Sequence, residues 1–152
     1  MTTSDFAVTI MVDQTPAEAF DAIANVPGWW NENFKGSAKS PDDVFSIQFG
    51  GTFVDFKIVE LASQKKAVWL VTDCNLDWLA DKKEWNDTQV VWDIATIGKA
   101  TEITMTHVGL VPEIECFENC KKGWNFFIGE SLFKLLTEKR GLPSTPKDDR
   151  DQ

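Results

Sequence analysis

The feature that most constrains the fold is a change of hydrophobic period partway along the chain. Between residues 34 and 110, apolar and polar side chains alternate, which is the pattern of half-buried β-strands. From Glu118 onward, apolar residues recur every three or four positions, which is the pattern of an amphipathic helix. The alternating segments are Phe34–Lys39, Val44–Phe49, Phe53–Leu61, Ala67–Asn75, Thr88–Thr96 and Ala100–Leu110.

Most of these predicted strands are joined by short turns, such as Gly50-Gly51 and Ile97–Lys99. Parallel pairing needs crossovers of about a dozen residues or more, so short turns predict antiparallel hairpins. Leu76–Asp87 is a longer connection that carries Trp78 and Trp85. A loop of this kind is either a lid over a site or a loop anchored by its own tryptophans.

The N-terminal region predicts a further strand and a capped helix. Phe6–Val12 alternates as a seventh strand. Thr15, Pro16 and Glu18 then form a helix start, with a capping side chain, a proline at the first position and a capping-box partner. This helix is expected to end before Pro27, and a second helical turn is expected at Trp29-Trp30.

At the other end, the long helix is predicted from Glu118 to about Arg140. Gly141 can cap it there, and Pro143 prevents its continuation. Residues 144–152 form a polar tail with no apolar anchor. A chain of 152 residues suits one domain, which we place at residues 1–143.

The predicted fold class is α+β, with a curved antiparallel sheet of six or seven strands around the long C-terminal helix. All helices lie on one face of this sheet. Antiparallel strands twist, and a twisted sheet curls around whatever it packs against. A single helix is too narrow to fill that concavity. The prediction therefore includes an apolar cavity between sheet and helix, the usual kind of binding site.

Several motifs resemble the activator-of-heat-shock-ATPase-like branch of the START/polyketide-cyclase (SRPBCC) superfamily. They are Trp29-Trp30, the segments Thr104–Leu110 and Val111–Cys120, Gly123-Trp124 with Glu130–Leu132, and Lys139–Pro143. The resemblance covers residues 6 to 143 and implies the helix-grip fold. It does not imply one function, because the superfamily includes lipid carriers, hormone receptors and cyclases, and the branch takes its name from co-chaperones.

Aromatic side chains are the main candidates for a binding site. The chain has seven Trp and eleven Phe but no Tyr, which supplies large apolar rings and almost no phenolic donors. Several rings come from distant segments that the predicted fold brings together. Alternatively, they fill the space completely and leave no pocket. The candidate ligand-binding residues are Trp30, Phe56, Trp69, Trp92, Met105, His107, Trp124 and Ile128.

His107, the only histidine, is the candidate catalytic residue. It lies in the last predicted strand and is expected to point toward the helix, where it could act as a general base or orient a ligand. The favoured interpretation is a buried neutral histidine bonded to one backbone carbonyl, because no carboxylate at a fixed spacing would orient its ring. The strand carboxylates are expected on the solvated face, with Asp55 and Asp73 the least clear.

The three cysteines, Cys74, Cys116 and Cys120, have no framework spacing, so reduced thiols in a cytoplasmic protein are expected. Cys116 and Cys120 could belong to a metal site, but zinc would need two more ligands and the chain has only one histidine. Neither a metal nor a cofactor is therefore predicted.

Charge excludes two classes of partner. With 15 basic and 24 acidic residues, the chain carries a formal charge of -9, so neither nucleic acid nor an anionic membrane surface is expected to bind. The sequence shows no secretory-signal pattern and no apolar stretch of about 20 residues. Phe126 and Phe133 lie opposite Trp124 on the helix, which predicts either a homodimer contact or cover by the N-terminal segment or a strand end.

Three hypotheses for function follow. The favoured one is a module that binds a small hydrophobic or aromatic molecule in the cavity between sheet and helix. The second is a cyclase- or hydrolase-like enzyme that uses His107. The third is a protein that acts on a chaperone or another partner and binds no ligand. A filled cavity would favour the third hypothesis.

Overall fold

The computed structural model describes residues 5–112 and 114–143 and contains a seven-stranded antiparallel sheet. Its strand order is β1-β7-β6-β5-β4-β3-β2, so β1 and β2 lie at the two edges. The sheet confirms the predicted architecture. Its strands are β1 (Phe6–Val12), β2 (Phe34–Gly36), β3 (Val44–Phe49), β4 (Thr52–Ala62), β5 (Lys66–Asn75), β6 (Gln89–Ile97) and β7 (Ala100–Val108).

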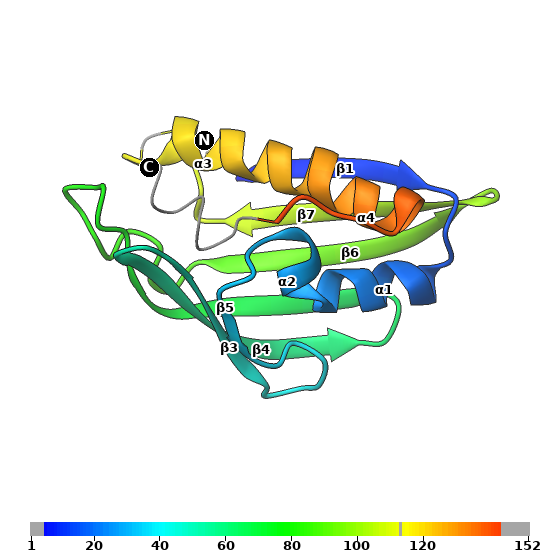
Figure 1. Cartoon of the computed structure of the whole chain (residues 1–152), viewed down its shortest axis with the longest axis horizontal. Helices are drawn as coiled ribbons and strands as arrows, with labels where there is room; N and C mark the ends of the chain where they lie inside the picture. The colour runs from blue at the N-terminus through cyan, green and yellow to red at the C-terminus, as the bar shows by residue number, and fades with distance from the viewer. Residues whose placement is uncertain (1–4, 113, 144–152) are drawn as a thin grey trace.

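The helices cover one face of the sheet (Figure 1). α1 (Pro16–Ala24) and α2 (Val26–Trp29) follow the first strand. The long C-terminal helix comprises α3 (Phe117–Phe126), the π-helical segment η1 (Phe127–Leu132) and α4 (Phe133–Glu138), without interruption. It lies along β1 and β7 in Figure 1, beside α1 and α2. In the described ranges, no helix is long and apolar enough to cross a membrane.

The π-helical segment explains how one face of the long helix stays buried. The buried residues Trp124, Ile128, Leu132 and Leu136 recur at intervals of four. An α-helix has about 3.6 residues per turn, so a strict spacing of four drifts around its surface. A π turn is wider, because its hydrogen bonds span five residues. The segment η1 therefore returns the apolar stripe toward the sheet.

Local hydrogen bonds fix the start of α1. The Glu18 amide donates to Thr15 Oγ1 (3.1 Å) and the Thr15 amide donates to Glu18 Oε1 (3.0 Å), which confirms the capping box.

The sheet bends where β4 pairs with β5. The register of this pair shifts at Asp55/Phe56 and at Ile58/Glu60, and such irregularities bend a strand.

Two predicted boundaries were wrong because turn chemistry overrides the apolar pattern. The strand predicted to reach Lys39 ends at Gly36, which has a φ of 105°. The Asp43 carboxylate then takes hydrogen bonds from the Ser37 hydroxyl and from the amides of Lys39 and Ser40. The second helical turn begins earlier than predicted, at Val26, with Pro27 in its first turn.

Residues 139–142 follow the C-terminal helix and lie against α2, and we call this segment the strap. Lys139, not Gly141, adopts the left-handed conformation at the helix end, with a φ of 63°. Ser131 Oγ donates to the Trp29 carbonyl (2.6 Å) and accepts from the Leu142 amide (2.6 Å). The chain beyond the helix is thereby held against the element that carries Trp29 and Trp30. The predicted polar tail, residues 144–152, lies outside the described residues.

Two glycines give a test of this strap. A Cβ added at Gly141 would collide with the Gly28 carbonyl oxygen, whereas one added at Gly123 in α3 meets nothing within 4 Å. We expect Gly141→Ala to lower the free energy of unfolding by about 1–3 kcal/mol through overpacking. Gly123→Ala should raise it by about 0.5–1 kcal/mol, because alanine favours a helix. Urea denaturation of both variants measures this, and equal effects would contradict the strap.

Candidate functional site

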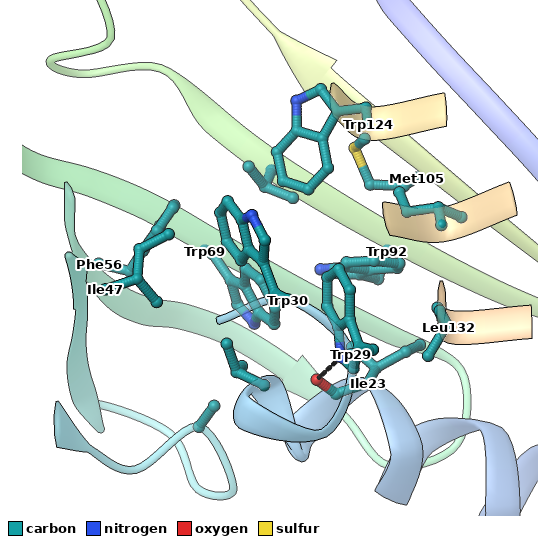
Figure 2. Close-up of a cluster of buried hydrophobic side chains, with 14 of the residues drawn as sticks. Ile23, Trp29, Trp30, Ile47, Phe56, Trp69, Trp92, Met105, Trp124 and Leu132 are labelled. Carbon is teal, nitrogen blue, oxygen red and sulfur yellow. Dashed lines mark hydrogen bonds between the residues drawn. The ribbon is translucent and has the colours of Figure 1, made fainter. Parts of the chain in front are cut away.

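The apolar site residues predicted from the sequence gather in one buried cluster under the C-terminal helix (Figure 2). Each comes from a different element, and none is more than 4% exposed. We call this group the ring cluster. Its predicted members are Trp30 at the end of α2, Phe56 in β4, Trp69 in β5, Trp92 in β6, Met105 in β7, Trp124 in α3 and Ile128 in η1.

Trp30 lies at the centre of the ring cluster. Its ring centroid is 4.8 Å from that of Trp124, 5.7 Å from Phe56 and 6.5 Å from Trp69. At these separations aromatic rings are in direct contact. Among the described residues, side chains therefore occupy the space where the sequence predicted an apolar cavity.

Sequence reasoning omitted two members of this cluster. Phe45 in β3 is 4.9 Å from Phe56 and 5.0 Å from Trp69, between ring centroids. Its alternation within β3 was a usable signal, because Phe45 pairs with the inward-facing Phe56. Trp29 stacks on Trp30 at 5.7 Å, and its burial depends on the turn at Pro27-Gly28, which no periodicity reveals.

His107 is fully buried and belongs to a chain of hydrogen bonds. Trp124 Nε1 donates to His107 Nδ1 (3.1 Å), and His107 Nε2 lies 2.9 Å from Thr88 Oγ1. An indole N–H can only donate, so Nδ1 must accept, and the proton of the neutral ring is on Nε2. Thr88 Oγ1 in turn donates to the Trp85 carbonyl (2.7 Å). These bonds link the helix, β7 and the Leu76–Asp87 loop.

These contacts correct the expectation that one backbone carbonyl would satisfy His107. Both ring nitrogens are instead bound by side chains from distant segments, which no local spacing predicts. Desolvation lowers the pKa of His107 to about 3, so the ring is neutral near neutral pH. Because Trp124 occupies the lone pair of Nδ1, the ring has no free acceptor for a substrate proton. This arrangement favours a structural role.

The strand carboxylates offer no alternative acid–base pair. Asp55 and Asp73 face each other across β4 and β5, but the Asp73 side chain is 48% exposed. Lys83 Nζ lies 3.1 Å from Asp73 Oδ1, and this hydrogen bond is the main cause that lowers the pKa of Asp73. Asp73 is therefore an ionised side chain on the solvated face.

Two glutamates hold the Leu76–Asp87 loop against the start of α3. Glu84 accepts hydrogen bonds from the amides of Glu115 and Cys116, both at 2.9 Å. Glu115 accepts from the amides of Ala80 (3.0 Å) and Asp81 (3.2 Å), which lower its pKa. Trp85 is buried beneath the loop. Of the two predicted interpretations, the structure favours an anchored loop over a lid, although of its two tryptophans only Trp85 anchors it and Trp78 is 47% exposed.

The expectation that all three cysteines are thiols was wrong. Cys116 and Cys120 form a disulfide, because a spacing of four places both on one face at the start of α3. Cys74 is free and buried. Within residues 5–112 and 114–143, no three or more histidine, cysteine, aspartate or glutamate side chains are grouped so that they could hold a metal ion.

A groove of about 570 Å³ opens beside the ring cluster, between the N-terminal helices and β2. We call it the α1–β2 groove. A second groove of about 340 Å³ lies between β1 and the C-terminal helix and is lined by Met11 and Phe133, among others. Phe133 is partly buried against the core, whereas Phe126 is 42% exposed. The lining of the α1–β2 groove includes Phe20, Ala24, Pro27, Phe34, Ala38 and Lys39.

Several solved structures of other proteins superpose on this chain over most of its length. The solution structure of the Aha1 dimer from Colwellia psychrerythraea matches with a TM-score of 0.70 and 19% identity, covering 90% of this chain and 96% of that one. Protein SSP2350 from Staphylococcus saprophyticus matches with a TM-score of 0.68 and 11% identity, covering 93% and 98%. DynU16, a putative protein in the dynemicin biosynthetic locus, matches with a TM-score of 0.67 and 17% identity, covering 92% of this chain and 49% of that one.

At these identities the matches show the fold alone. They confirm the helix-grip fold, and the presence of an Aha1 protein among them agrees with the resemblance found in the sequence. No family model and no curated protein sequence matches the chain.

The buried histidine predicts a specific pH dependence of stability. In the unfolded chain His107 takes up a proton near its ordinary pKa of 6.5, whereas in the folded protein it does so near 3. The unfolded state therefore binds more protons between these values, and stability falls as pH falls through this window. We expect a loss of about 2 kcal/mol between about pH 7 and pH 5 from this group.

Chemical denaturation at the two pH values measures the effect. His107→Gln serves as the control, because it retains the other titrating groups, including the carboxylates. The pH-dependent loss should be smaller in this variant by the contribution of the imidazole. Equal losses in both proteins would contradict a buried neutral ring.

Proposed function

We propose that the protein binds a small apolar or aromatic molecule between the concave face of the sheet and the C-terminal helix. The α1–β2 groove serves as the entrance. The observation that carries this proposal is a chain of ring contacts that leads from the groove to the ring cluster. Phe34 lines the groove, and its ring centroid lies 5.6 Å from that of Phe45, which contacts both Phe56 and Trp69.

The proposed lining is the ring cluster, and its movable part is Trp30. Trp30 follows the four-residue helix α2 and is held by contacts with other rings. If the Trp30 side chain turns aside, an aromatic ring of the ligand can take its place and restore these contacts. The groove volume of about 570 Å³ falls within the range typical of small-molecule sites. His107 would fix the Trp124 ring in this lining rather than touch the ligand.

We rank binding above catalysis because of the state of the imidazole. A cyclase- or hydrolase-like mechanism would need His107 to accept a proton, but Nδ1 already accepts from Trp124 and burial keeps the ring from being protonated. One protein with this fold comes from a biosynthetic locus, a setting in which binding of a small molecule is a natural role.

A second candidate function is interaction with a protein partner, without any ligand. The specific observation in its favour is the direct packing of Trp30 against Trp124 and Phe56. If those contacts persist in solution, no small molecule enters, and the protein acts through its surface. A chaperone partner belongs to this candidate function.

We also propose that the protein forms a homodimer through Phe126, which is 42% exposed. A solution structure with the same fold is described as a dimer. The proposed location is the cytoplasm; the free thiol of Cys74 supports it, whereas a disulfide such as Cys116–Cys120 is rare there.

A fluorescent probe tests the ligand site. We expect an anilinonaphthalene dye to bind with one-to-one stoichiometry and to gain emission. Ala24 lines the groove from α1, so Ala24→Phe should fill the entrance and weaken binding roughly tenfold. Titration of the dye emission gives both values.

Ala17→Phe is the matched control, because Ala17 lies on the same helix and does not line the groove. Its affinity for the dye should equal that of the unchanged protein. If both variants bind equally well, the groove is not the entrance. If the unchanged protein binds no dye and native mass spectrometry finds no co-purifying molecule, the partner-protein hypothesis prevails.

A substitution that replaces an apolar side chain by a polar one tests the proposed dimer contact. Phe126→Ser should weaken self-association roughly tenfold, because it removes an apolar ring from the interface. Ile97→Ser, at the exposed end of β6, should leave self-association unchanged. Sedimentation equilibrium measures both variants, and a monomeric unchanged protein would rule out the dimer.

A further inference from the structure

The indole N–H of Trp92 is a buried hydrogen-bond donor for which the described residues supply no acceptor. Three of the other indoles do have acceptors. The indoles of Trp29 and Trp124 donate to the Ile23 carbonyl and to His107, and that of Trp85 donates to Cys116. Leaving such a group without a partner costs free energy, so an unpaired indole at the centre of a core calls for an explanation.

The position of Trp92 connects its N–H with the proposed site. Trp92 lies in the interior of β6, opposite Met105 of β7, and is fully buried. Its ring is 5.6 Å from Trp29 and 5.3 Å from Trp69, both edge-on. In Figure 2 the nitrogen end of Trp92 faces the two tryptophans of the α2 region. Of these two rings, Trp30 is the one that moves aside in the proposed function when a ligand enters.

The charges around the ring cluster limit what this donor can receive. The buried polar side chains of the described residues are Asn31, Thr52, Thr101, His107 and Ser131, without a lysine or arginine. A carboxylate or phosphate in this interior would lose its hydration and gain no opposite charge. An indole N–H cannot accept, so it can pair only with a lone pair on the ligand and not with a ligand O–H or N–H group.

Resting on the proposed function, we infer that the ligand is a neutral apolar or aromatic molecule with a hydrogen-bond acceptor, such as a carbonyl or ether oxygen, which receives the N–H of Trp92. Trp92 is then the residue that orients the ligand. The other rings provide apolar contact area, whereas the hydrogen bond from Trp92 fixes the orientation of the ligand. An N–H placed over the face of a neighbouring ring is the competing explanation for the missing acceptor.

Two matched probes test the inference. Acetylnaphthalene carries a carbonyl oxygen, and isopropenylnaphthalene has the same shape with a methylene group in its place. We expect the ketone to bind roughly five- to tenfold more tightly, because only it accepts a hydrogen bond. In ¹H–¹⁵N spectra, the Trp92 indole proton should move downfield with the ketone and much less with the hydrocarbon.

Two variants separate the hydrogen bond from the ring. Trp92→Phe removes the donor and should abolish the preference for the ketone. Trp69→Phe makes the same loss of ring area at a neighbouring position and should weaken both probes while it retains their ratio. If Trp92→Phe does not fold, the indole signal of the unchanged protein decides the question.

The possible failures are distinguishable. If both probes bind with equal affinity and the Trp92 signal does not move, ligand binding stands and the role of Trp92 is overturned. If neither probe binds, the proposed function fails and the inference fails with it. A ketone-specific shift of the Trp92 signal that Trp69→Phe retains supports both.

Discussion

The structure depends on an imidazole that is buried without charge and bonded on both sides. His107 joins Trp124 of the helix to Thr88 at the end of the loop that precedes β6. Thr88 continues the chain to the Trp85 carbonyl, and the Trp85 ring stacks on Trp124 at 6.1 Å between centroids. Helix, β7 and loop therefore constrain one another. If the Trp124 ring were displaced, a polar atom would be stranded in an apolar interior, so the position of the helix over the sheet is closely specified.

The elements of this fold were predictable because their signals are local. Alternation marked β3 to its boundaries, and Thr15 with Glu18 marked the start of α1. The site was predictable in part, because inward alternation selected Trp92, Met105 and His107 without knowledge of their partners. Hydrogen-bond partners depend on tertiary structure. Nothing near His107 in sequence indicates Thr88 as its partner.

The chemistry of the interior restricts the range of possible functions more than the fold does. Proteins with this architecture and less than a fifth of their residues in common show that the helix-grip frame admits very different sequences. In this chain the frame encloses a tryptophan N–H without an acceptor among the described residues, a neutral histidine whose two nitrogens are occupied, and no buried lysine or arginine among the same residues. Under the proposed function, such an interior would recognise a ligand by its shape and by one acceptor, and the cost of desolvation would disfavour a charged ligand.

The π-helical segment sets how the long helix is rotated about its own axis. Trp124, in α3, is fixed by its bond to His107, and Ser131, within η1 itself, binds the Trp29 carbonyl and the Leu142 amide. Because the wide turn offsets the drift of a four-residue spacing, both residues keep their partners along one helix. An inserted residue between them would rotate one of them away from its partners by about 100°.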